Sequence, residues 1–396
     1  MEGYIGENGT LGLMKNRNIE KVFKMIQLHA PISRATISKQ SGLNKATVSS
    51  CVAVLIENGL VAEQGQEITT GRPSTLLEPK GESGVIMGIE FNVFSLSRIL
   101  VTDLVGRQLE SYTVTHRPDP DVFVDIVVKH AARIRADYAG KRLGLVGIAI
   151  AVPGNFNQQS QRVGYMVLPD WIDYPLREKL EPRLHSIPLF LDMTSIVGVL
   201  GETHFGRRST PLDYLVFVNG AWGISVGVYA NGNIPMGVSG FSERFGHTIV
   251  HANGRLCACG NKGCLQAYIS VRSLFERLYP NVDFAEHYLQ EIHRQYHQGK
   301  ENVVEAIDEL VYYLGIGLIN LISSYNPGKI CIGGLLGKLL DSSLLDRVKQ
   351  HVNDIIPHYF RKNLEIYCSE LGEYSIVYGC VASVKENLVS ILSHGN

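Results

Sequence analysis

Three cysteines and a histidine in the second half of the chain have the types and spacing of metal ligands. Cys257, Cys259 and Cys264 fall within eight residues of one another, with two glycines between them, and His247 lies ten residues upstream. Glycine permits the backbone angles that fold several side chains onto one point, and a closed Cys3His set is typical of a structural zinc ion. We predict structural zinc on these four residues, with His251 as the alternative histidine. The competing interpretation is three small buried side chains on a turn.

The composition is that of an ordinary globular protein. The chain has 396 residues, of which 45% are hydrophobic and 19% charged, and its net charge is −1 with a pI near 6.9. This length predicts two or three domains. The near-neutral charge excludes a uniformly basic nucleic-acid binder but is compatible with a small DNA-binding module on a larger neutral body.

The sequence predicts a cytoplasmic protein without a membrane partner. Residues 1–13 are glycine-rich and acidic, with no basic region before an apolar core, so they lack the pattern of a secretion signal. We expect no apolar run that approaches the length needed to cross a bilayer. Cysteines that resemble metal ligands, in a chain with no export signal, fit a reducing compartment.

The first 80 residues predict a flexible tail at 1–14 and a winged helix-turn-helix domain at 15–80. Apolar residues recur at helical spacing up to His29. Ser33 and Asn44 are suited to cap the next two helices, and a glycine-containing turn between such helices is typical of the motif. The predicted elements are helices at 16–29, 34–40 and 44–58, strands at 60–63 and 74–77, and a polar wing at 64–73.

Short polar and basic residues stand where a recognition helix and a wing would reach DNA. The recognition helix of this motif enters the major groove, and residues near its N-terminus contact base edges. A wing can reach phosphate or the minor groove. We predict contacts with double-stranded operator DNA from Arg34, Lys39, Asn44, Lys45, Thr47, Ser49, Ser50 and Arg72. The competing interpretation is a small helical bundle with no nucleic-acid role.

The rest of the chain predicts two successive α/β units. A linker at 79–84 is followed by a run of strands and then by alternating helices and strands, and this order begins again at Tyr214. We predict a first lobe at 81–198, with the C-terminal helix at 375–396 packing back onto it, and a second lobe at 199–374 that contains the zinc loop. A cleft between two lobes is a usual ligand site.

Several motifs together resemble a known family. They are Cys257-x-Cys259-Gly260-x-x-Gly263-Cys264 with Gly246-His247 ahead of it, Pro31-Ile32-Ser33-Arg34, Gly42-Leu43-Asn44-Lys45-x-Thr47-Val48-Ser49, Gly71-Arg72-Pro73, and Asn326-Pro327 ahead of Gly333-Gly334. With them the chain resembles the ROK family of repressors, open reading frames and sugar kinases, and within it the xylose-repressor type. The resemblance implies an α/β protein with an N-terminal winged helix-turn-helix and a two-lobed, actin-like (ribonuclease-H-like) sugar-kinase fold. It also implies a homodimer, a structural zinc, an inducer sugar in the cleft, and repression of carbohydrate operons through palindromic operators.

The chain departs from the family's kinases where a phosphate would be handled. Those kinases open with an Asp-x-Gly-Gly-Thr loop, whereas Asn92, Val93 and Phe94 stand here in place of the small residues, so backbone amides cannot approach phosphate closely. Thr194 stands where the family has an aspartate base, and a threonine hydroxyl is no useful base near neutral pH. We therefore predict that the chain is not an enzyme.

The family's sugar-binding positions have changed as well. Arg244 and Gln266 replace two glutamates. Carboxylates suit sugar hydroxyls, whereas arginine grips a carboxylate or phosphate with two parallel bonds. An anionic sugar-derived effector, a neutral sugar and no effector all stay open, and Arg244 could also turn outward or pair with Glu243 or Glu202. The candidate ligand-binding residues are Asp192, Thr194, Arg244, His247 and Gln266.

These features predict a dimeric DNA-binding repressor of carbohydrate-metabolism genes, controlled by a ligand through a catalytically inactive, kinase-like body. Two alternatives stay open. One is a sugar kinase of the family with a regulatory appendage, and the other is a constitutive DNA-binding regulator with a vestigial cleft.

Overall fold

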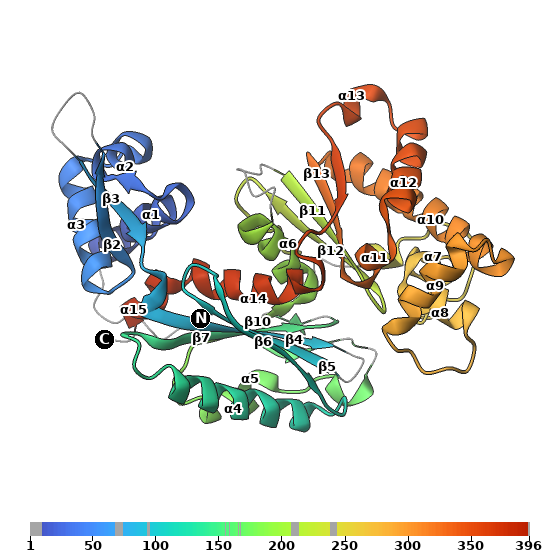
Figure 1. Ribbon diagram of the computed structural model, residues 1–396, viewed down its shortest axis with the longest axis horizontal. Helices are drawn as coiled ribbons and strands as arrows, with labels where there is room; N and C mark the ends of the chain where they lie inside the picture. The colour runs from blue at the N-terminus through green and yellow to red at the C-terminus, as the bar shows by residue number, and fades with distance from the viewer. Residues whose placement is uncertain are drawn as a thin grey trace.

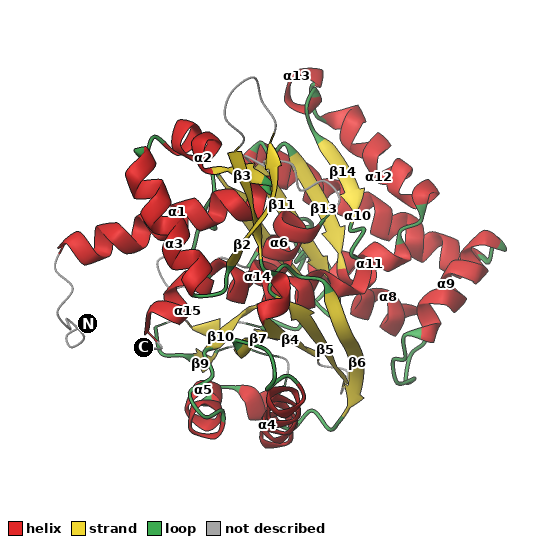
Figure 2. Cartoon of the chain, turned by 60° about the vertical axis from the view of Figure 1, so that its left-hand side comes forward, coloured by secondary structure: helices red, strands yellow, loops and turns green. Residues whose placement is uncertain are grey.

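The computed structural model describes residues 10–67, 74–92, 96–154, 156–157, 159–164, 166, 168–206, 214–237 and 244–394. They form a small helical module and two larger lobes, each lobe built on its own sheet (Figure 1). The helical module and the outer helices of the second lobe lie at opposite ends of the molecule (Figure 2). The predicted α/β class is confirmed.

The N-terminal module has three helices and a three-stranded sheet. Gly42 ends the second helix with a φ of 73°, a conformation that glycine adopts readily. The side chain of Asn44 accepts a hydrogen bond from the Thr47 N–H at 2.8 Å and so caps the third helix. The elements are α1 (Thr10–His29), α2 (Arg34–Ser41) and α3 (Lys45–Glu57), with strands β1 (Ile32–Ser33), β2 (Val61–Glu67) and β3 (Ser74–Pro79) in the order β1-β3-β2.

The first helix begins earlier than predicted. A flexible tail was expected at residues 1–14, but α1 already begins at Thr10, so the last part of that tail is helical. Leucine, methionine and lysine favour helix, and the single Gly12 lowers the helix propensity by only about 1 kcal/mol. Extending an existing helix is also easier than nucleating one. Residues 1–9 lie outside the described part of the chain.

The first lobe is a five-stranded sheet with helices on both faces. Its order is β10-β7-β4-β5-β6, in which β10, β7 and β4 are parallel and β5 and β6 are antiparallel additions. Side chains alternate along β4, since Ile86 packs with the helix α14 (Ser375–Glu386) and Met87 with the helix α4. The bounds are β4 (Gly84–Asn92), β5 (Leu96–Asp103), β6 (Gln108–Thr115), α4 (Pro120–Asp137), β7 (Gly144–Val152), β8 (Phe156–Asn157), β9 (Arg162–Val163), α5 (Leu176–Leu180) and β10 (Leu189–Met193).

The second lobe is a four-stranded sheet in the order β12-β11-β13-β14. The pair β11–β12 is antiparallel and the other pairs are parallel. Phe217 on β11 faces the core that contains α6, and Val216 and Val218 face the core that contains α10. The bounds are α6 (Thr194–Phe205), β11 (Tyr214–Gly220), β12 (Ile224–Ala230), α7 (Gln266–Ile269), α8 (Val271–Leu278), α9 (His287–His297), α10 (Glu301–Tyr325), β13 (Lys329–Gly333), α11 (Gly334–Leu339), α12 (Ser342–Ile355), α13 (His358–Arg361) and β14 (Glu365–Cys368).

Helices α6 and α14 cross between the two sheets at very short backbone distance. A Cβ atom on Gly379 would lie 1.6 Å from Val197 O, and one on Gly201 would lie 2.2 Å from Ser375 O. Only glycine permits so close an approach at these two positions. The short α15 (Leu388–His394) follows α14 and packs against α1. The C-terminal helices therefore connect the junction of the two lobes with the N-terminal module.

One helix contradicts an expectation from the sequence. By length and composition α10 could cross a membrane, whereas no apolar run was expected to approach that length. Asp308 and Glu309 interrupt the run in the sequence, but a helix tolerates a few charges on its outer face. Residues such as Leu310 and Leu314 are buried in the core of the second lobe. This placement is that of the core helix of a globular protein.

Candidate functional site

The four predicted metal ligands converge on one point. The ligand atoms of His247, Cys257, Cys259 and Cys264 all lie within 4.8 Å of one another. His247 Nδ1 is 3.6 Å from Cys257 Sγ, and the Sγ atoms of Cys259 and Cys264 are 3.7 Å apart. A tetrahedral zinc ion, with bonds of about 2.3 Å to sulfur and about 2.0 Å to nitrogen, separates such pairs by about 3.5 Å and about 3.8 Å. The four side chains could therefore hold a metal ion.

The local backbone explains why these residues meet and why the alternative histidine does not join them. Gly263 has a φ of 78°, and a Cβ atom there would lie 1.8 Å from His251 O. His251 itself lies outside the group of four ligands. Its Nδ1 is 2.8 Å from the Tyr313 hydroxyl, and its ring stacks with those of Tyr268 and Tyr313. Of the two histidines, His247 is the one placed to be a ligand.

The pKa values of the thiols and of the imidazole in the cluster are also compatible with a bound metal cation. Burial, with hydrogen bonds to Cys259 and Cys257, raises the pKa of the Cys264 thiol to about 12. Burial also opposes ionisation of Cys259, but a backbone N–H and the two other thiols lower its pKa below the ordinary value. Burial, assisted by the charge of Arg244, lowers the pKa of His247, so its ring is neutral and can act as a ligand. Three thiols this close lose all their protons only when a cation compensates the charge.

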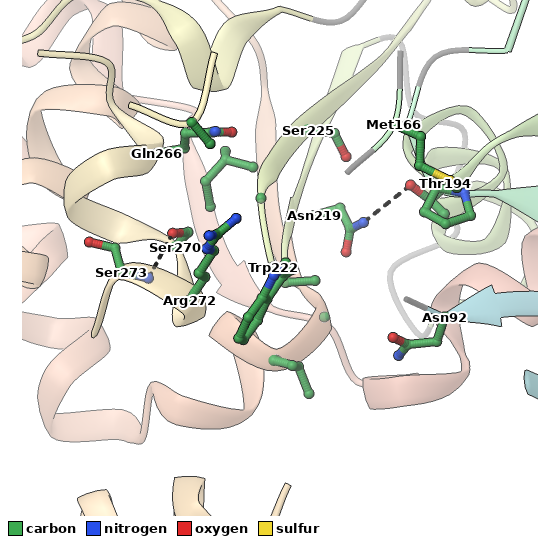
Figure 3. Close-up of a pocket in the computed structure, with 18 of the residues that line it drawn as sticks. Asn92, Met166, Thr194, Asn219, Trp222, Ser225, Gln266, Ser270, Arg272 and Ser273 are labelled. Atoms are coloured by element: carbon green, nitrogen blue, oxygen red, sulfur yellow. Dashed lines mark hydrogen bonds between the residues drawn. The ribbon is translucent and has the colours of Figure 1, made fainter. Parts of the chain in front are cut away.

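A cavity of about 890 Å³ lies beside this cluster, between the lobes. His247 and Cys257 belong both to the cluster and to the cavity wall. Gln266 also lines the cavity, and its Nε2 donates to Cys257 Sγ at 3.4 Å. In Figure 3 Gln266 lies on one side of the cavity and Thr194 on the other. A metal ion in the cluster would fix one wall of the cavity.

Three of the five candidate ligand-binding residues line the cavity and two do not. Thr194, His247 and Gln266 are lining residues, and Thr194 Oγ1 accepts a hydrogen bond from Asn219 Nδ2 at 3.4 Å. Asp192 and Arg244 are not among the described lining residues. Asp192 Oδ1 accepts the Met193 N–H at 2.8 Å. Arg244 is exposed, close enough to His247 to affect its pKa.

The two carboxylates suggested as partners of Arg244 are Glu202 and Glu243. Glu202 is buried and accepts hydrogen bonds from the hydroxyls of Ser369, at 2.5 Å, and Ser375, at 2.9 Å. This carboxylate therefore joins α6 to the segment that begins α14, at the junction of the lobes. Glu243 lies outside the described residues, as do Val93 and Phe94 of the altered phosphate loop.

Most polar residues of the cavity wall are not among the predicted site residues. Asn219 and Ser225 come from the second sheet, Ser270 and Arg272 from the start of α8, and Trp222 from the bend between β11 and β12 (Figure 3). The Arg272 guanidinium lies 5.7 Å from the centre of the Trp222 ring. Aromatic faces with a few amides and hydroxyls are typical of a site for a small, partly apolar ligand. The available signal was Trp222, one of two tryptophans, within a glycine-bearing bend.

The arginines and the lysine of the cavity wall are paired with carboxylates in the described part of the chain. A neutral ligand suits such a wall better than an anion, which would have to displace a carboxylate from its partner. The pairs are Arg98 with Glu90 (2.8 Å) and Glu373 (2.9 Å), Arg255 and Arg277 with Glu309 (2.7 and 2.6 Å), Arg272 with Glu276 (2.8 Å), and Lys338 with Glu286 (2.5 Å) and Glu373 (2.6 Å).

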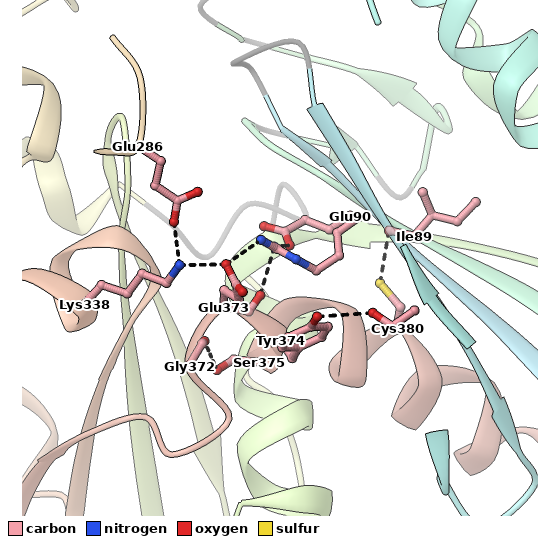
Figure 4. Close-up of polar contacts among 11 residues, drawn as sticks. Ile89, Glu90, Glu286, Lys338, Gly372, Glu373, Tyr374, Ser375 and Cys380 are labelled. Atoms are coloured by element: carbon pink, nitrogen blue, oxygen red, sulfur yellow. Dashed lines mark hydrogen bonds and ion pairs between the residues drawn. The ribbon is translucent and has the colours of Figure 1, made fainter. Parts of the chain in front are cut away.

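One series of these ion pairs crosses from lobe to lobe (Figure 4). It starts at Glu90 and Arg98 in the first sheet and continues through Glu373 ahead of α14 to Lys338 on α11. It ends at Glu286, which directly precedes α9. Burial raises the pKa of Glu90, although Arg98 opposes this effect. Burial also acts on Glu373, but Lys338 and Arg98 hold its pKa below the ordinary value. The protein's own charges thus occupy the region next to the stretch that corresponds to the kinases' phosphate loop.

Seven of the eight predicted DNA-contacting residues lie in the described part of the N-terminal module, and all seven are exposed or half-buried. Lys39 at the end of α2 is exposed, and Arg34 forms an ion pair with Glu63 Oε1 on β2 at 2.6 Å. Arg72, predicted at the tip of the wing, lies outside the described residues. The opposite face of α3 is buried. Exposed or half-buried polar residues at the start of α3 are Asn44, Lys45, Thr47, Ser49 and Ser50, and the buried ones behind them are Val48, Cys51, Val52 and Leu55.

Residues 88–387, which span both lobes, match the ROK family. The chain belongs to the ROK family. As a family member it also has named relatives along nearly its whole length. The xylose repressors of Bacillus subtilis (strain 168) and Bacillus spizizenii are 29% and 30% identical to it, with 96% of this chain and 98% and 97% of the relatives covered. The transcriptional dual regulator NagC of Escherichia coli K12 is 27% identical, covering 98% of this chain and 97% of NagC.

Solved structures of the ROK family share the fold. A ROK family transcriptional regulator, a homologue of the E. coli MLC protein, has a TM-score of 0.80 at 22% identity and covers 96% of this chain and 100% of its own. A ROK glucokinase from Streptomyces griseus, in complex with glucose and AMPPNP, has a TM-score of 0.63 at 22% identity and covers 75% of this chain and 98% of its own. The predicted fold is confirmed.

Proposed function

We propose that this chain is a cytoplasmic, DNA-binding transcriptional repressor of carbohydrate-metabolism genes, controlled by a sugar in the cleft. The observation that carries this proposal is that polar residues at the start of α3 are exposed. The N-terminal module that contains α3 lies within the part of the chain that aligns with relatives named xylose repressors. The glucokinase covers only 75% of the chain. The family match begins at residue 88 and so leaves out the N-terminal module, whereas the match to the xylose repressors covers 96% of the chain.

Lys45, Thr47, Ser49 and Ser50 are proposed to enter the major groove from the start of α3. Short side chains let the helix backbone approach the bases, and the N-terminus of a helix attracts phosphate. Lys39, Asn44 and Arg72 would position the module on the DNA backbone. Arg34 can contribute in the same way because its ion pair with Glu63 is partly exposed and therefore weak.

The cleft is proposed to bind ligand without transferring phosphate. Thr194 Oγ1 already accepts a hydrogen bond from Asn219, and a hydroxyl cannot take a proton from a sugar near neutral pH. The ion pairs from Glu90 to Lys338 place two carboxylates, Glu90 and Glu373, beside the region where a nucleotide's phosphates would have to lie. Arg98 and Lys338 are already engaged with these carboxylates and with Glu286, so a phosphate would have to displace a carboxylate to bind either cation.

A neutral sugar is the ligand that the cavity favours. The wall offers Trp222 as an apolar face, and the amides of Asn219 and Gln266 with the hydroxyls of Ser225 and Ser270 as hydrogen-bonding groups. Arg244, on which the idea of an anionic effector rested, is not among the described lining residues, and the cations that do line the wall are engaged with carboxylates. A zinc ion on His247 and the three cysteines is proposed to hold the adjoining wall in place.

The path from ligand to DNA is proposed to run through α14. This helix begins beside Glu373 at the cavity, crosses α6, and leads to α15, which packs on α1 of the DNA-binding module. A movement of the lobes would therefore shift the module. In a homodimer on a palindromic operator the two modules must match half-sites about 34 Å apart, so a small shift suffices to release DNA.

The test is binding of full-length protein to DNA from the region upstream of its own gene, measured by fluorescence anisotropy at several salt concentrations. We expect specific binding at least about 1,000-fold tighter than binding to unrelated DNA. Lys45→Ala should weaken binding, whereas Lys129→Ala, an exposed lysine on α4, should not. Equal affinity for upstream and unrelated DNA would overturn the proposal. ATP turnover with neutral sugars would favour the kinase alternative.

A further inference from the structure

A second group of metal-ligand side chains lies in the second lobe, separate from the cysteine cluster. His293 and His297 stand one helical turn apart on α9 and face the same side. Asp341 stands at the N-cap of α12. The ligand atoms of these three residues lie within 4.8 Å of one another. None of the three is among the described residues that line the large cavity.

The three atoms form a tight triangle. His293 Nε2 and His297 Nε2 each lie 2.9 Å from Asp341 Oδ2, and the two nitrogens are 3.3 Å apart. A first-row transition metal with bonds of about 2.05 Å separates two of its ligands by about 2.9 Å at a right angle and by about 3.3 Å at the tetrahedral angle. The triangle therefore matches one face of the coordination polyhedron of such an ion.

The geometry is fixed by the surrounding structure. Asp341 Oδ1 accepts the Leu344 N–H at 2.8 Å and caps α12, which leaves Oδ2 directed at the two histidines. The two rings meet edge to face with centres 4.5 Å apart, an arrangement that brings both Nε2 atoms to the same oxygen. The side chains are 37%, 48% and 26% exposed for His293, His297 and Asp341, so solvent can reach the point between them.

We propose that His293, His297 and Asp341 bind a second divalent transition-metal ion, with solvent at its remaining positions. Two imidazoles and one carboxylate select zinc, nickel, cobalt or copper over calcium and magnesium, which prefer oxygen ligands. Three protein ligands leave the site open, in contrast to the closed Cys3His set. The ion joins α9 to α12, two helices that are distant in the sequence.

The site also lies close to the ion pairs of the cleft. Asp341 follows Lys338 by three residues, and Glu286, which pairs with Lys338 at 2.5 Å, directly precedes α9. A metal ion that fixes α9 to α12 therefore fixes both ends of the Lys338–Glu286 pair. Binding at this site stabilises the second-lobe side of the cavity.

The test is metal stoichiometry of untagged, full-length protein, measured by mass spectrometry of metals after equilibrium dialysis against micromolar zinc and removal of free metal. We expect two zinc ions per chain in the wild type and one in His293→Gln/His297→Gln. Asp341→Asn should also bind one zinc ion. Its side-chain oxygen can still cap α12, so a loss of zinc in this variant cannot be attributed to unfolding. His287→Gln, an exposed histidine on the same helix, should bind two.

The alternative without a metal ion is that the two imidazoles only donate hydrogen bonds to Asp341. It predicts the same zinc stoichiometry in the wild type, in His293→Gln/His297→Gln and in Asp341→Asn, and that result would overturn the proposal. A Cys257→Ser/Cys264→Ser variant separates the sites. We expect it to keep one ion per chain, and that ion should disappear when His293→Gln/His297→Gln is added.

Discussion

Replacing Gly379 with alanine tests the close crossing of α6 and α14, through which we expect the ligand signal to pass. A Cβ atom at this position would lie 1.6 Å from Val197 O and 2.3 Å from Val197 C. Carbon and oxygen atoms that are not bonded to each other approach to about 3.3 Å. The two helices must therefore separate by about 1.7 Å at this point, or their backbones must distort.

The expected cost is large because the obstacle is backbone. Adding a methylene group to a packed core usually costs about 1–3 kcal/mol, when neighbouring side chains can yield. Here the Val197 carbonyl cannot rotate away, and α6 and α14 are each held by a sheet. We expect Gly379→Ala to lower the free energy of unfolding by at least about 3 kcal/mol. Gly140→Ala is the control, since nothing lies within 4 Å of its added Cβ, and it should raise stability by up to about 1 kcal/mol.

The assay is guanidinium unfolding followed by tryptophan fluorescence. The chain has two tryptophans, and Trp171 is fully buried in the first lobe. In a Trp222→Phe background, Trp171 therefore reports the unfolding of that lobe alone. A Gly379→Ala protein with the same unfolding midpoint as Gly140→Ala would refute the close crossing and, with it, the route from the cleft to α1.

Three further predictions concern the DNA-binding surface, the metal cluster and the ion pairs of the cleft. Lys39→Ala should lower the slope of log affinity against log salt by about one, as measured by anisotropy titrations, and an unchanged slope would place Lys39 away from the phosphate backbone. Cys257→Ser should lose one bound zinc ion per chain in metal analysis, whereas retention of the full amount would exclude it as a ligand. The pKa of Glu373 is held below its ordinary value of 4.5, so its carboxylate stabilises the folded state above that pH, and this contribution disappears as the pH falls through the lowered pKa. Glu373→Gln should therefore be less stable than the wild type by about 0.5–1 kcal/mol at pH 7, the difference should shrink as the pH falls through the lowered pKa of Glu373, and a constant difference would contradict the shift.

The parts of the site that depend on short stretches of sequence could be predicted. The ligand atoms of the Cys3His cluster come from residues 247–264, and glycine at 263 is required by a contact within the same loop. Asn44 was recognised as a cap because the capping interaction spans only three residues. In such cases local backbone preferences determine which side chains meet.

The cleft could not be predicted in the same way. Arg98 and Glu373 are 275 residues apart, and their contact depends on how α14 returns to the first sheet. For Arg244 the sequence motif suggested a ligand contact that the structure does not show. Arg244 is exposed and is not among the described residues of the cavity wall. The group of His293, His297 and Asp341 could not be predicted for the same reason, since His297 and Asp341 are 44 residues apart in the sequence.

The measurement that tests the central claim most directly is release of the upstream DNA from full-length protein by a sugar. Protein is held on labelled DNA at physiological salt while neutral pentoses and hexoses, sugar acids and sugar phosphates are added in turn. The account predicts that a neutral sugar weakens binding by about tenfold or more, a coupling of about 1.4 kcal/mol, and that Trp222→Ala abolishes the effect. Release by sugar acids or phosphates alone would contradict the neutral ligand, and specific binding that no compound relieves would contradict control through the cleft.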